Sequence, residues 1–363
     1  MRFNLVINLE RMHPDEDMRE VICHVTEMVQ MADEGGIDIV WGAEHHAIEM
    51  TIAPGPFQLL SHFAAHTSRI RLGTGVVVAP YWHPIKLAGE AALLDLLSGG
   101  RLEFGIGKGA YQREFDRMVN GMEMNLGVPM MQEMLPVLKA LWQGDYKHDG
   151  EYWSFPTATA CPKPLQQPHP PIWVAARDAG TFDWAVKQGC SVMTWALTRP
   201  FAEIETYMER FENALAANPG VKRPRFMTMR HAAIYEDART RDIYIEAVRN
   251  QGRQFENLFR NLAPIADGFA QAPDPTLLTN QAEYEPANLL DNLIFGSPDE
   301  AIAKLKRYEA LGVDYYCYQA SYGLPLAEQK NSLHLFLDKV MPAFEDAPAE
   351  GTLAREMPVP SQL

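Results

Sequence analysis

The amino-acid sequence predicts an α/β protein, a (β/α)8 TIM barrel with insertions. Three observations predict this fold. Short apolar runs alternate with segments of helical periodicity along nearly the whole chain, and eight such runs can be counted. Alternation of this kind favours parallel strands joined by right-handed helical crossovers. The length of 363 residues suits one barrel with insertions, and no linker or repeat divides the chain.

The predicted strands are runs rich in apolar and β-branched residues. They are expected at residues 3–8, 37–41, 70–79, 101–106, 172–176, 191–195, 225–235 and 314–319. The predicted helices carry apolar residues on one face and are bounded by capping signals. They are expected at residues 15–34, 56–67, 83–97, about 129–143, 179–188, 201–217, 237–262, 298–311 and 325–344. Ser297 and Glu300 form a capping box, and Pro84 lies in the first turn of its helix.

Three stretches interrupt the alternation. A long loop is expected between Gly109 and the helix that begins near residue 129. Residues 144–171 carry aromatic residues among prolines and glycines, which predicts an inserted surface hairpin. Residues 263–292 lack periodicity and are expected to form a mobile insertion near the active face, as a lid does. Residues 1–345 are then a single barrel domain, and residues 346–363 are expected to be a disordered tail.

The composition disfavours several classes of protein. A formal net charge of -15 argues against a nucleic-acid partner or an anionic membrane surface. The four cysteines form no CxxC pair, which favours a reducing compartment over a disulfide framework. No apolar run approaches the roughly 18 residues that span a bilayer, and the start of the chain reads as a strand. We therefore expect a soluble protein of the cytoplasm.

The chemistry of a (β/α)8 barrel lies at the C-terminal ends of its strands. Glu44-His45-His46 follows the second predicted strand, where a short apolar run stops abruptly. A lone histidine is more often a packing residue than a catalytic one, but its place at a strand end in a barrel reverses that preference. His45 is the expected general acid or base, because an imidazole exchanges a proton near neutral pH. His46 is expected to pack or form a hydrogen bond in the loop.

Two turns could bind a phosphate. Lys108 lies in a glycine-rich turn after the fourth strand, and Arg177, Asp178 and Thr181 follow the fifth. Exposed N–H groups and helix N-termini attract an anion at such turns. Lys108 could equally be a solvated surface charge with glycines that only shape the turn. The surrounding residues do not form a Rossmann fingerprint.

A metal centre is disfavoured at Glu44-His45-His46. Adjacent residues on an extended segment point in opposite directions, so the two histidines would not readily face one ion. The first strand ends in Asn8-Leu9-Glu10, where a metal hydrolase barrel usually has two histidines one residue apart. We therefore expect no metal.

The order of several short motifs resembles the bacterial luciferase-like flavin monooxygenases, and the luciferase catalytic subunit in particular. These motifs cover the chain from Met1 to about Phe344: GIDIVW followed by EHH from Gly36, LGTGVVV from Leu72, HP at His83, LD at Leu94, SGGRLEFGIG from Ser98 and FGSP from Phe295. The resemblance implies an enzyme that uses reduced FMN and O2 through a C4a-(hydro)peroxyflavin to oxygenate a small apolar organic substrate. It also implies a homodimer packed through helices near the second and third strands, and a separate NAD(P)H:flavin reductase.

The resemblance also assigns roles to residues. It implies that His45 is catalytic, with Glu44 orienting it or bonding the flavin ring, and that Gly75-Val76 is a non-proline cis peptide beneath that ring. The remaining cofactor positions are Lys108, Ala176, Arg177, Asp178, Thr181 and Trp195, and the substrate positions are Tyr81, Tyr111 and Met193. The chain departs from luciferase at three places. Gly107 replaces a reactive cysteine, the second phosphate arginine expected near Val128 is absent, and Arg177 stands where luciferase has an acidic residue.

Three alternatives stay open. A deazaflavin-dependent hydride-transfer oxidoreductase shares the expected fold and needs no oxygen. A non-catalytic flavin-binding protein is the second alternative, although such a chain would be expected to lose His45. A metal hydrolase is the third.

Overall fold

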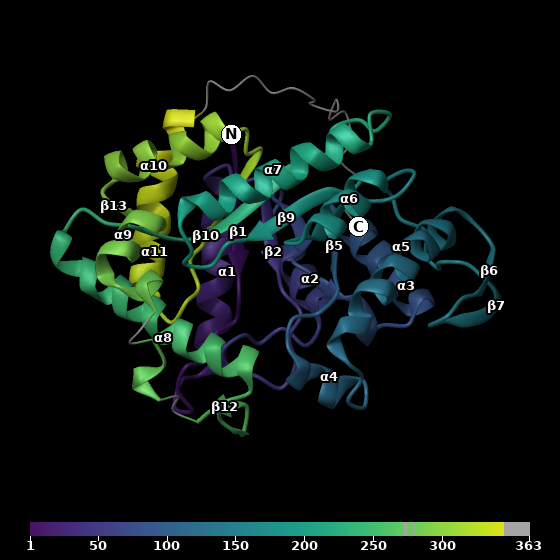
Figure 1. Ribbon diagram of the computed structural model, residues 1–363, viewed down its shortest axis with the longest axis horizontal. Helices are drawn as coiled ribbons and strands as arrows, with labels where there is room; N and C mark the ends of the chain where they lie inside the picture. Colours follow the sequence, from purple (N-terminus) through teal and green to yellow (C-terminus); the bar gives the residue numbers. More distant parts are fainter. Residues whose placement is uncertain (272–273, 279–280, 345–363) are drawn as a thin grey trace.

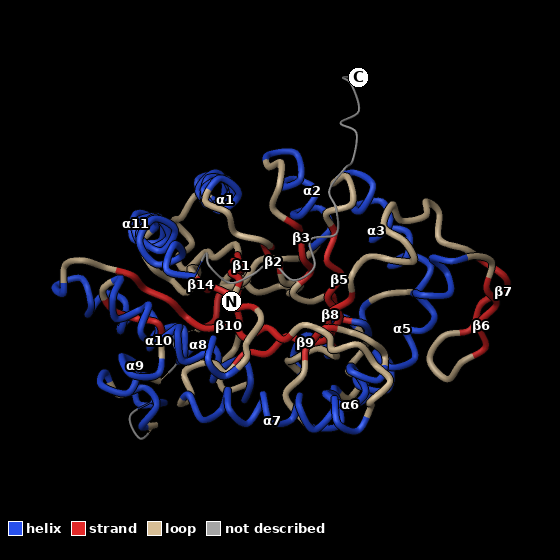
Figure 2. Tube along the Cα trace, turned by 90° about the horizontal axis from the view of Figure 1, so that it is seen from above, coloured by secondary structure: helices blue, strands red, loops and turns tan. Residues whose placement is uncertain are grey.

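A closed ring of parallel strands lies at the centre of the protein. The computed structural model describes residues 1–271, 274–278 and 281–344, so the expected tail at 346–363 lies outside the described residues. Around the ring the strands pair in the order β1, β2, β3, β5, β8, β9, β10 and β14, and β14 pairs again with β1 (Figures 1 and 2). Their bounds are Arg2–Ile7, Ile39–Gly42, Arg71–Thr74, Leu102–Gly107, Ile172–Ala175, Ser191–Trp195, Phe226–Ile234 and Tyr315–Gln319. This confirms the (β/α)8 barrel.

Helices surround the ring, as Figure 2 shows from above. They are α1 (Met18–Glu34), α2 (Pro56–His66), α3 (Pro84–Leu97), α5 (Gly127–Gln143), α6 (Ala179–Lys187), α7 (Phe201–Ala217), α8 (Arg241–Arg260), α10 (Pro298–Leu311) and α11 (Leu326–Leu335). The helix caps expected from the sequence are present in the structure. Ser297 and Glu300 form the capping box of α10, and Pro84 begins α3 after His83.

Two clusters of the described core cover the two faces of the barrel strands. The larger part lies between strands and helices and includes Val25, Leu60 and Phe104. The smaller part fills the barrel with side chains from alternate strand positions, among them Val6, Met193, Met227 and Cys317. Alternation along each strand therefore tells which residues face the barrel axis.

Two elements differ from the predicted ones. The strand expected at residues 70–79 is divided into β3 and β4 (Val77–Val78), and the peptide between Gly75 and Val76 is cis. The long loop expected after Gly109 contains a helix, α4 (Gln112–Met118). Its sequence was not recognised as helical because Arg113 and Glu114 are buried beside Phe115, which reverses the usual pattern of apolar residues inside.

The two insertions contain regular structure. The expected hairpin within residues 144–171 is present as β6 (Tyr146–Asp149) and β7 (Ser154–Ala158), which pair antiparallel. The described part of 263–292 is more regular than expected, with β11 (Ile265–Ala266), β12 (Phe269–Ala270) and α9 (Pro286–Asn292). In Figure 1, β12 and α4 lie at the same end of the barrel. A short strand, β13 (Ile294–Gly296), pairs with β10 outside the ring. None of the described helices is long and apolar enough to cross a membrane.

Candidate active site

His45 lies just beyond β2 and is paired with a buried carboxylate. Its Nδ1 is 3.2 Å from one carboxylate oxygen of Glu114 and 3.3 Å from the other. The Glu114 side chain is only 1% exposed, and it also accepts a 2.7 Å hydrogen bond from the backbone N–H of His46. A carboxylate on Nδ1 selects the ring orientation and leaves Nε2 as the nitrogen that can exchange a proton. The pair therefore has the geometry of an oriented general acid or base.

Glu44 serves a different set of groups. Its carboxylate accepts hydrogen bonds from the backbone N–H of Val78 at 2.6 Å and from the indole N–H of Trp82 at 2.9 Å. Its remaining described contact is with His46 Nε2 at 3.0 Å. Glu44 thus ties the end of β2 to β4 and to His46, and the carboxylate that contacts His45 is Glu114. His46 forms a hydrogen bond, as the sequence led us to expect.

The strands beside His45 end on a surface that carries few side chains. A Cβ atom on Gly105 would lie 2.0 Å from the carbonyl oxygen of Thr74, and one on Gly107 would lie 2.6 Å from Val76 Cγ2. Only glycine fits at these two positions of β5. The expected cis peptide at Gly75-Val76 is present next to them. A flat apolar ring could lie close to the backbone here, which is what an isoalloxazine requires.

The turn after β8 carries a carboxylate at the N-terminus of α6. Asp178 caps α6 and accepts hydrogen bonds from the Thr181 backbone N–H at 2.9 Å and from its hydroxyl at 2.8 Å. Burial alone would raise the pKa of Asp178, but these hydrogen bonds and the nearby Lys108 cation outweigh it and lower the pKa. Lys108 and the Asp178 turn are therefore neighbours, although their strands differ. Ala176, which precedes the turn, is buried.

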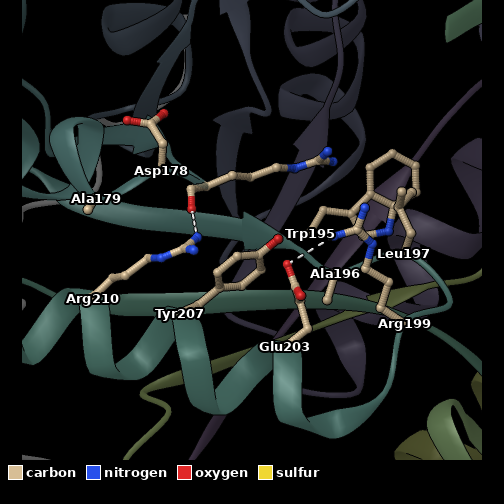
Figure 3. Close-up of a pocket in the computed structure, with 10 residues that line it drawn as sticks. Asp178, Ala179, Trp195, Ala196, Leu197, Arg199, Glu203, Tyr207 and Arg210 are labelled. Atoms are coloured by element: carbon tan, nitrogen blue, oxygen red, sulfur yellow. Dashed lines mark hydrogen bonds and ion pairs between the residues drawn. The ribbon is translucent and has the colours of Figure 1, made fainter.

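A pocket of about 440 Å³ opens at this turn (Figure 3). Arg177, Arg199 and Arg210 line it together with Trp195 and Tyr207. Arg210 donates to the backbone carbonyl of Arg177, and Arg199 lies 3.3 Å from the carboxylate of Glu203, as the dashed lines in Figure 3 mark. The lining of the pocket therefore combines three guanidinium groups with the carboxylates of Asp178 and Glu203.

Aromatic side chains connect this pocket to His45. The Tyr111 ring is 5.4 Å from the His45 ring, and its pKa is raised mainly by burial and further by Glu114, while Arg177 opposes the rise. Tyr111 therefore lies within electrostatic range of both the histidine pair and the pocket. Trp195 lines the pocket and also packs in one apolar cluster with Tyr111. Tyr111 and Trp195 therefore link the histidine to the arginine-lined pocket.

The other two expected substrate residues occupy different depths. Tyr81 lies beside His46 and Phe115, with ring centroids 5.5 and 5.4 Å away, and its hydroxyl is buried without a hydrogen-bond partner among the described residues. Met193 lies one layer deeper in the interior cluster of the barrel, where its methyl group would be 3.0 Å from a Cβ on Gly105.

Sequence reasoning missed Glu114, Arg199 and Arg210. Glu114 lies on the unrecognised helix α4, and no residue pattern links it to His45, 69 positions earlier. Arg199 follows β9 and could have been noticed, because it comes shortly after a strand end. Arg210 lies inside α7, where a charged residue ordinarily indicates a solvated helix face. Over the described residues, no group of three or more histidine, cysteine or acidic side chains could hold a metal ion.

Comparisons with known proteins bear on the family and the fold of the chain. The family model described as Luciferase-like monooxygenase matches residues 1–315. The oxygenase component of the flavin-dependent trigonelline monooxygenase of Acinetobacter baylyi is 39% identical over 347 residues, which cover 96% of each chain.

Solved structures share the fold. Monooxygenase RslO1 from Streptomyces bottropensis superposes with a TM-score of 0.79 at 24% identity and covers 94% of this chain and 99% of its own. The oxygenating constituent of 3,6-diketocamphane monooxygenase from Pseudomonas putida, in complex with FMN, has a TM-score of 0.72 at 21% identity, with 94% and 98% covered. An F420-dependent secondary alcohol dehydrogenase has a TM-score of 0.73 at 18% identity, with 95% and 99% covered.

Proposed function

The chain belongs to the luciferase-like monooxygenase family, and from this premise we propose that it is the oxygenase of a two-component flavin system. It would use reduced FMN and O2 to insert one oxygen atom into a small organic substrate. The observation that carries the proposal is the His45–Glu114 pair, which Tyr111 and Trp195 link to the arginine-lined pocket. Bound reduced FMN would supply the electrons that activate oxygen through a C4a-hydroperoxide.

The described residues fit FMN. Arg177 and Arg210 would hold the phosphate, and Lys108 would add a further positive charge. These cations would take the place of the second phosphate arginine, which is absent near Val128. The glycine positions of β5 would leave room for the ring beside Gly75-Val76, and Trp195 would line its edge. Riboflavin has the same ring without the phosphate, so it separates the two halves of this binding site.

The protein itself would contribute to catalysis by exchanging one proton with the reacting groups and by excluding water from the site. His45 Nε2 would exchange the proton, because Glu114 engages the opposite ring nitrogen. Tyr111, Phe255 and Ile48 form part of an apolar cluster over the site, and the 263–270 segment packs against that cluster through Ile265. Excluding water there would keep the activated oxygen from decaying unproductively.

The substrate and the partners are also proposals. Tyr81, Trp82 and Tyr111 favour an apolar or aromatic substrate. Trigonelline is a compound to assay first, because a relative is named for it. A separate NAD(P)H:flavin reductase would supply reduced FMN, since that relative is named as an oxygenase component. A homodimer would cover the exposed leucines of α3, Leu93, Leu96 and Leu97, which are 47%, 41% and 62% exposed. Sedimentation equilibrium would reveal a monomer if the dimer proposal is wrong.

The decisive test of the proposal is oxygen labelling. Purified protein is supplied with reduced FMN, substrate and 18O2, and the product is analysed by mass spectrometry. One labelled atom per product molecule is expected, and no product is expected anaerobically. Anaerobic turnover with a reduced deazaflavin would instead establish hydride transfer, the reaction class that the structural likeness to the secondary alcohol dehydrogenase keeps in view.

A further inference from the structure

Three segments from distant parts of the chain meet at the active end of the barrel. They are residues 44–50 after β2, the helix α4, and residues 261–270, which we call the flap. Figure 1 shows β12 of the flap and α4 at the same end of the barrel. The apolar cluster between these segments consists of Ile48, Met50, Tyr111, Phe255 and Leu258, with Ile265 of the flap packed against it. Because the Tyr111 ring lies 5.4 Å from the His45 ring, this cluster borders the His45–Glu114 pair.

The first contact joins residues 44–50 to α4 through Glu114. Its carboxylate lies 3.2 Å from His45 Nδ1 and accepts a hydrogen bond from the His46 backbone N–H at 2.7 Å. A helix of seven residues, such as α4, is not stable by itself in water, and α4 has no side-chain cap at its N-terminus. The position of Glu114 opposite His45 therefore depends on the contacts that hold α4 in place.

The second contact joins α4 to the flap through Arg113, the residue before Glu114. Its Nη2 donates hydrogen bonds to the backbone carbonyl of Ala263 at 2.8 Å and to the side-chain oxygen of Asn261. Arg113 is 7% exposed, and its Nη1 is buried without a hydrogen-bond partner among the described residues. A buried cation costs free energy unless it is hydrogen-bonded, so the position of this side chain depends on the two flap oxygens.

The third contact joins the flap back to residues 44–50. The carbonyl of Gly268 accepts a hydrogen bond from the backbone N–H of Glu49 at 2.9 Å. At the start of the flap, the backbone N–H of Ala263 donates to the side-chain oxygen of the buried Asn257 on α8 at 2.7 Å. Ala263 is therefore held on both sides, its N–H by α8 and its carbonyl by α4.

Each of the three segments is thus bonded to the other two. Lifting the flap would remove both acceptors from Arg113 and leave a buried guanidinium unpaired. It would also break the contact with Glu49 and expose the apolar cluster to water. Arg113 and Glu114 are consecutive residues of one short helix, so a displacement of Arg113 would move Glu114 relative to His45. A closed flap, a dry cluster and an oriented histidine should therefore occur together.

Resting on the proposed function, we propose that Arg113 is a positioning residue for oxygenation. By bonding the flap, Arg113 makes the contact of Glu114 with His45 depend on a closed flap. The site would then exchange a proton only while water is excluded. Opening of the flap, for substrate to enter or product to leave, would take the carboxylate away from His45 and suspend that exchange.

The first test measures amide hydrogen exchange in the full-length protein saturated with oxidised FMN. Arg113→Met removes the donor, and Asn261→Gly removes one acceptor without backbone strain, because the φ of Asn261 is 54°. Both variants should speed the exchange of the His46 amide, on the far side of α4, by about tenfold. Arg260→Met is the matched control and should leave this exchange unchanged, because Arg260 is exposed and pairs with Glu256 of its own helix.

The second test measures product and hydrogen peroxide per reduced FMN consumed. Arg113→Met should lower the product about tenfold and raise the peroxide, while the dissociation constant for FMN stays within about twofold. Arg113→Lys keeps a cationic donor and should recover most of the product. The double variant Arg113→Met/Glu114→Gln should lose no more product than Glu114→Gln alone, because both changes act on the same pair.

Several outcomes would overturn the assignment. Unchanged exchange of the His46 amide in both Arg113→Met and Asn261→Gly would show that the flap and the pair are independent. So would a double variant whose loss equals the product of the two single losses. Parallel losses of product and FMN affinity would make Arg113 a merely structural residue. Failure of the wild-type protein to incorporate labelled oxygen would defeat the proposed function, whereas the exchange result needs no turnover. If Arg113→Met does not fold, Asn261→Gly decides.

Discussion

Replacing Glu114 with glutamine tests the catalytic pair with the smallest change in shape. The amide oxygen of the new side chain can still accept from the backbone N–H of His46, so the loop after β2 should keep its conformation. The variant loses the negative charge opposite His45 Nδ1, where the carboxylate oxygens lie at 3.2 and 3.3 Å. A hydrogen bond to a charged group contributes about 1.5–3 kcal/mol.

That contribution can be converted to a rate. Each 1.36 kcal/mol corresponds to about tenfold, so losing the charge should lower the rate of substrate oxygenation by about 10- to 100-fold. The assay measures product per reduced FMN consumed together with hydrogen peroxide released. We expect product to fall and peroxide to rise, while the dissociation constant for FMN stays within twofold. Glu44→Gln is the matched control, and it should act on stability, because Glu44 holds Val78 and Trp82. An unchanged product yield in Glu114→Gln would refute the role of the pair.

Three further predictions concern the pocket, the barrel and pH. Arg177→Ala should weaken FMN binding about 10- to 100-fold in fluorescence titrations and leave riboflavin binding unchanged; an equal loss for both would remove Arg177 from the phosphate site. Gly105→Ala should lower the free energy of unfolding in urea by about 1–3 kcal/mol, because its Cβ would lie 2.0 Å from a carbonyl oxygen; a neutral result would contradict the packing. Burial lowers the pKa of His231 from 6.5 to about 4. Between these two pH values the unfolded chain binds a proton that the folded chain does not bind. The free energy of unfolding should therefore fall by about 3 kcal/mol as the pH drops from 6.5 to 4. The pKa of Glu10 is raised from 4.5 to about 8 by burial, so stability should fall as pH rises from 4.5 through 8. His231→Gln should flatten the acid slope and Glu10→Gln the alkaline slope, and slopes that persist in these variants would assign the effect elsewhere.

Long helices with a periodic apolar face could be predicted from the sequence. A short helix that buries charged residues, and a contact between distant residues, could not. The apolar face of α1 is evident from Val21, Val25, Met28 and Val29, all of which are buried, because nothing except burial explains that spacing. The short helix α4 breaks the rule, since it buries charged residues that find partners only in the folded protein.

The site shows the same division. His45 was found because it follows a strand directly, whereas Glu114 required knowledge of which loop returns to that strand. The proximity of His231 and Gln319 could be predicted only after closure of the barrel, since the two residues are brought together by the pairing of β10 with β14. Alternation places each of them on a face, but the register that makes them neighbours is a tertiary property.

We infer that His45 controls the oxygen activated on the flavin but is not needed to bind the flavin. The deciding measurement mixes the protein with reduced FMN and oxygen in a stopped-flow spectrometer and follows the absorbance of the flavin hydroperoxide, first for the wild type and then for His45→Ala. In the wild type we expect a long-lived absorbance that decays faster, with formation of product, when substrate is added. In His45→Ala we expect unchanged FMN affinity and the loss of most of the product. Coupled turnover at the wild-type level in His45→Ala would show that His45 has no such role.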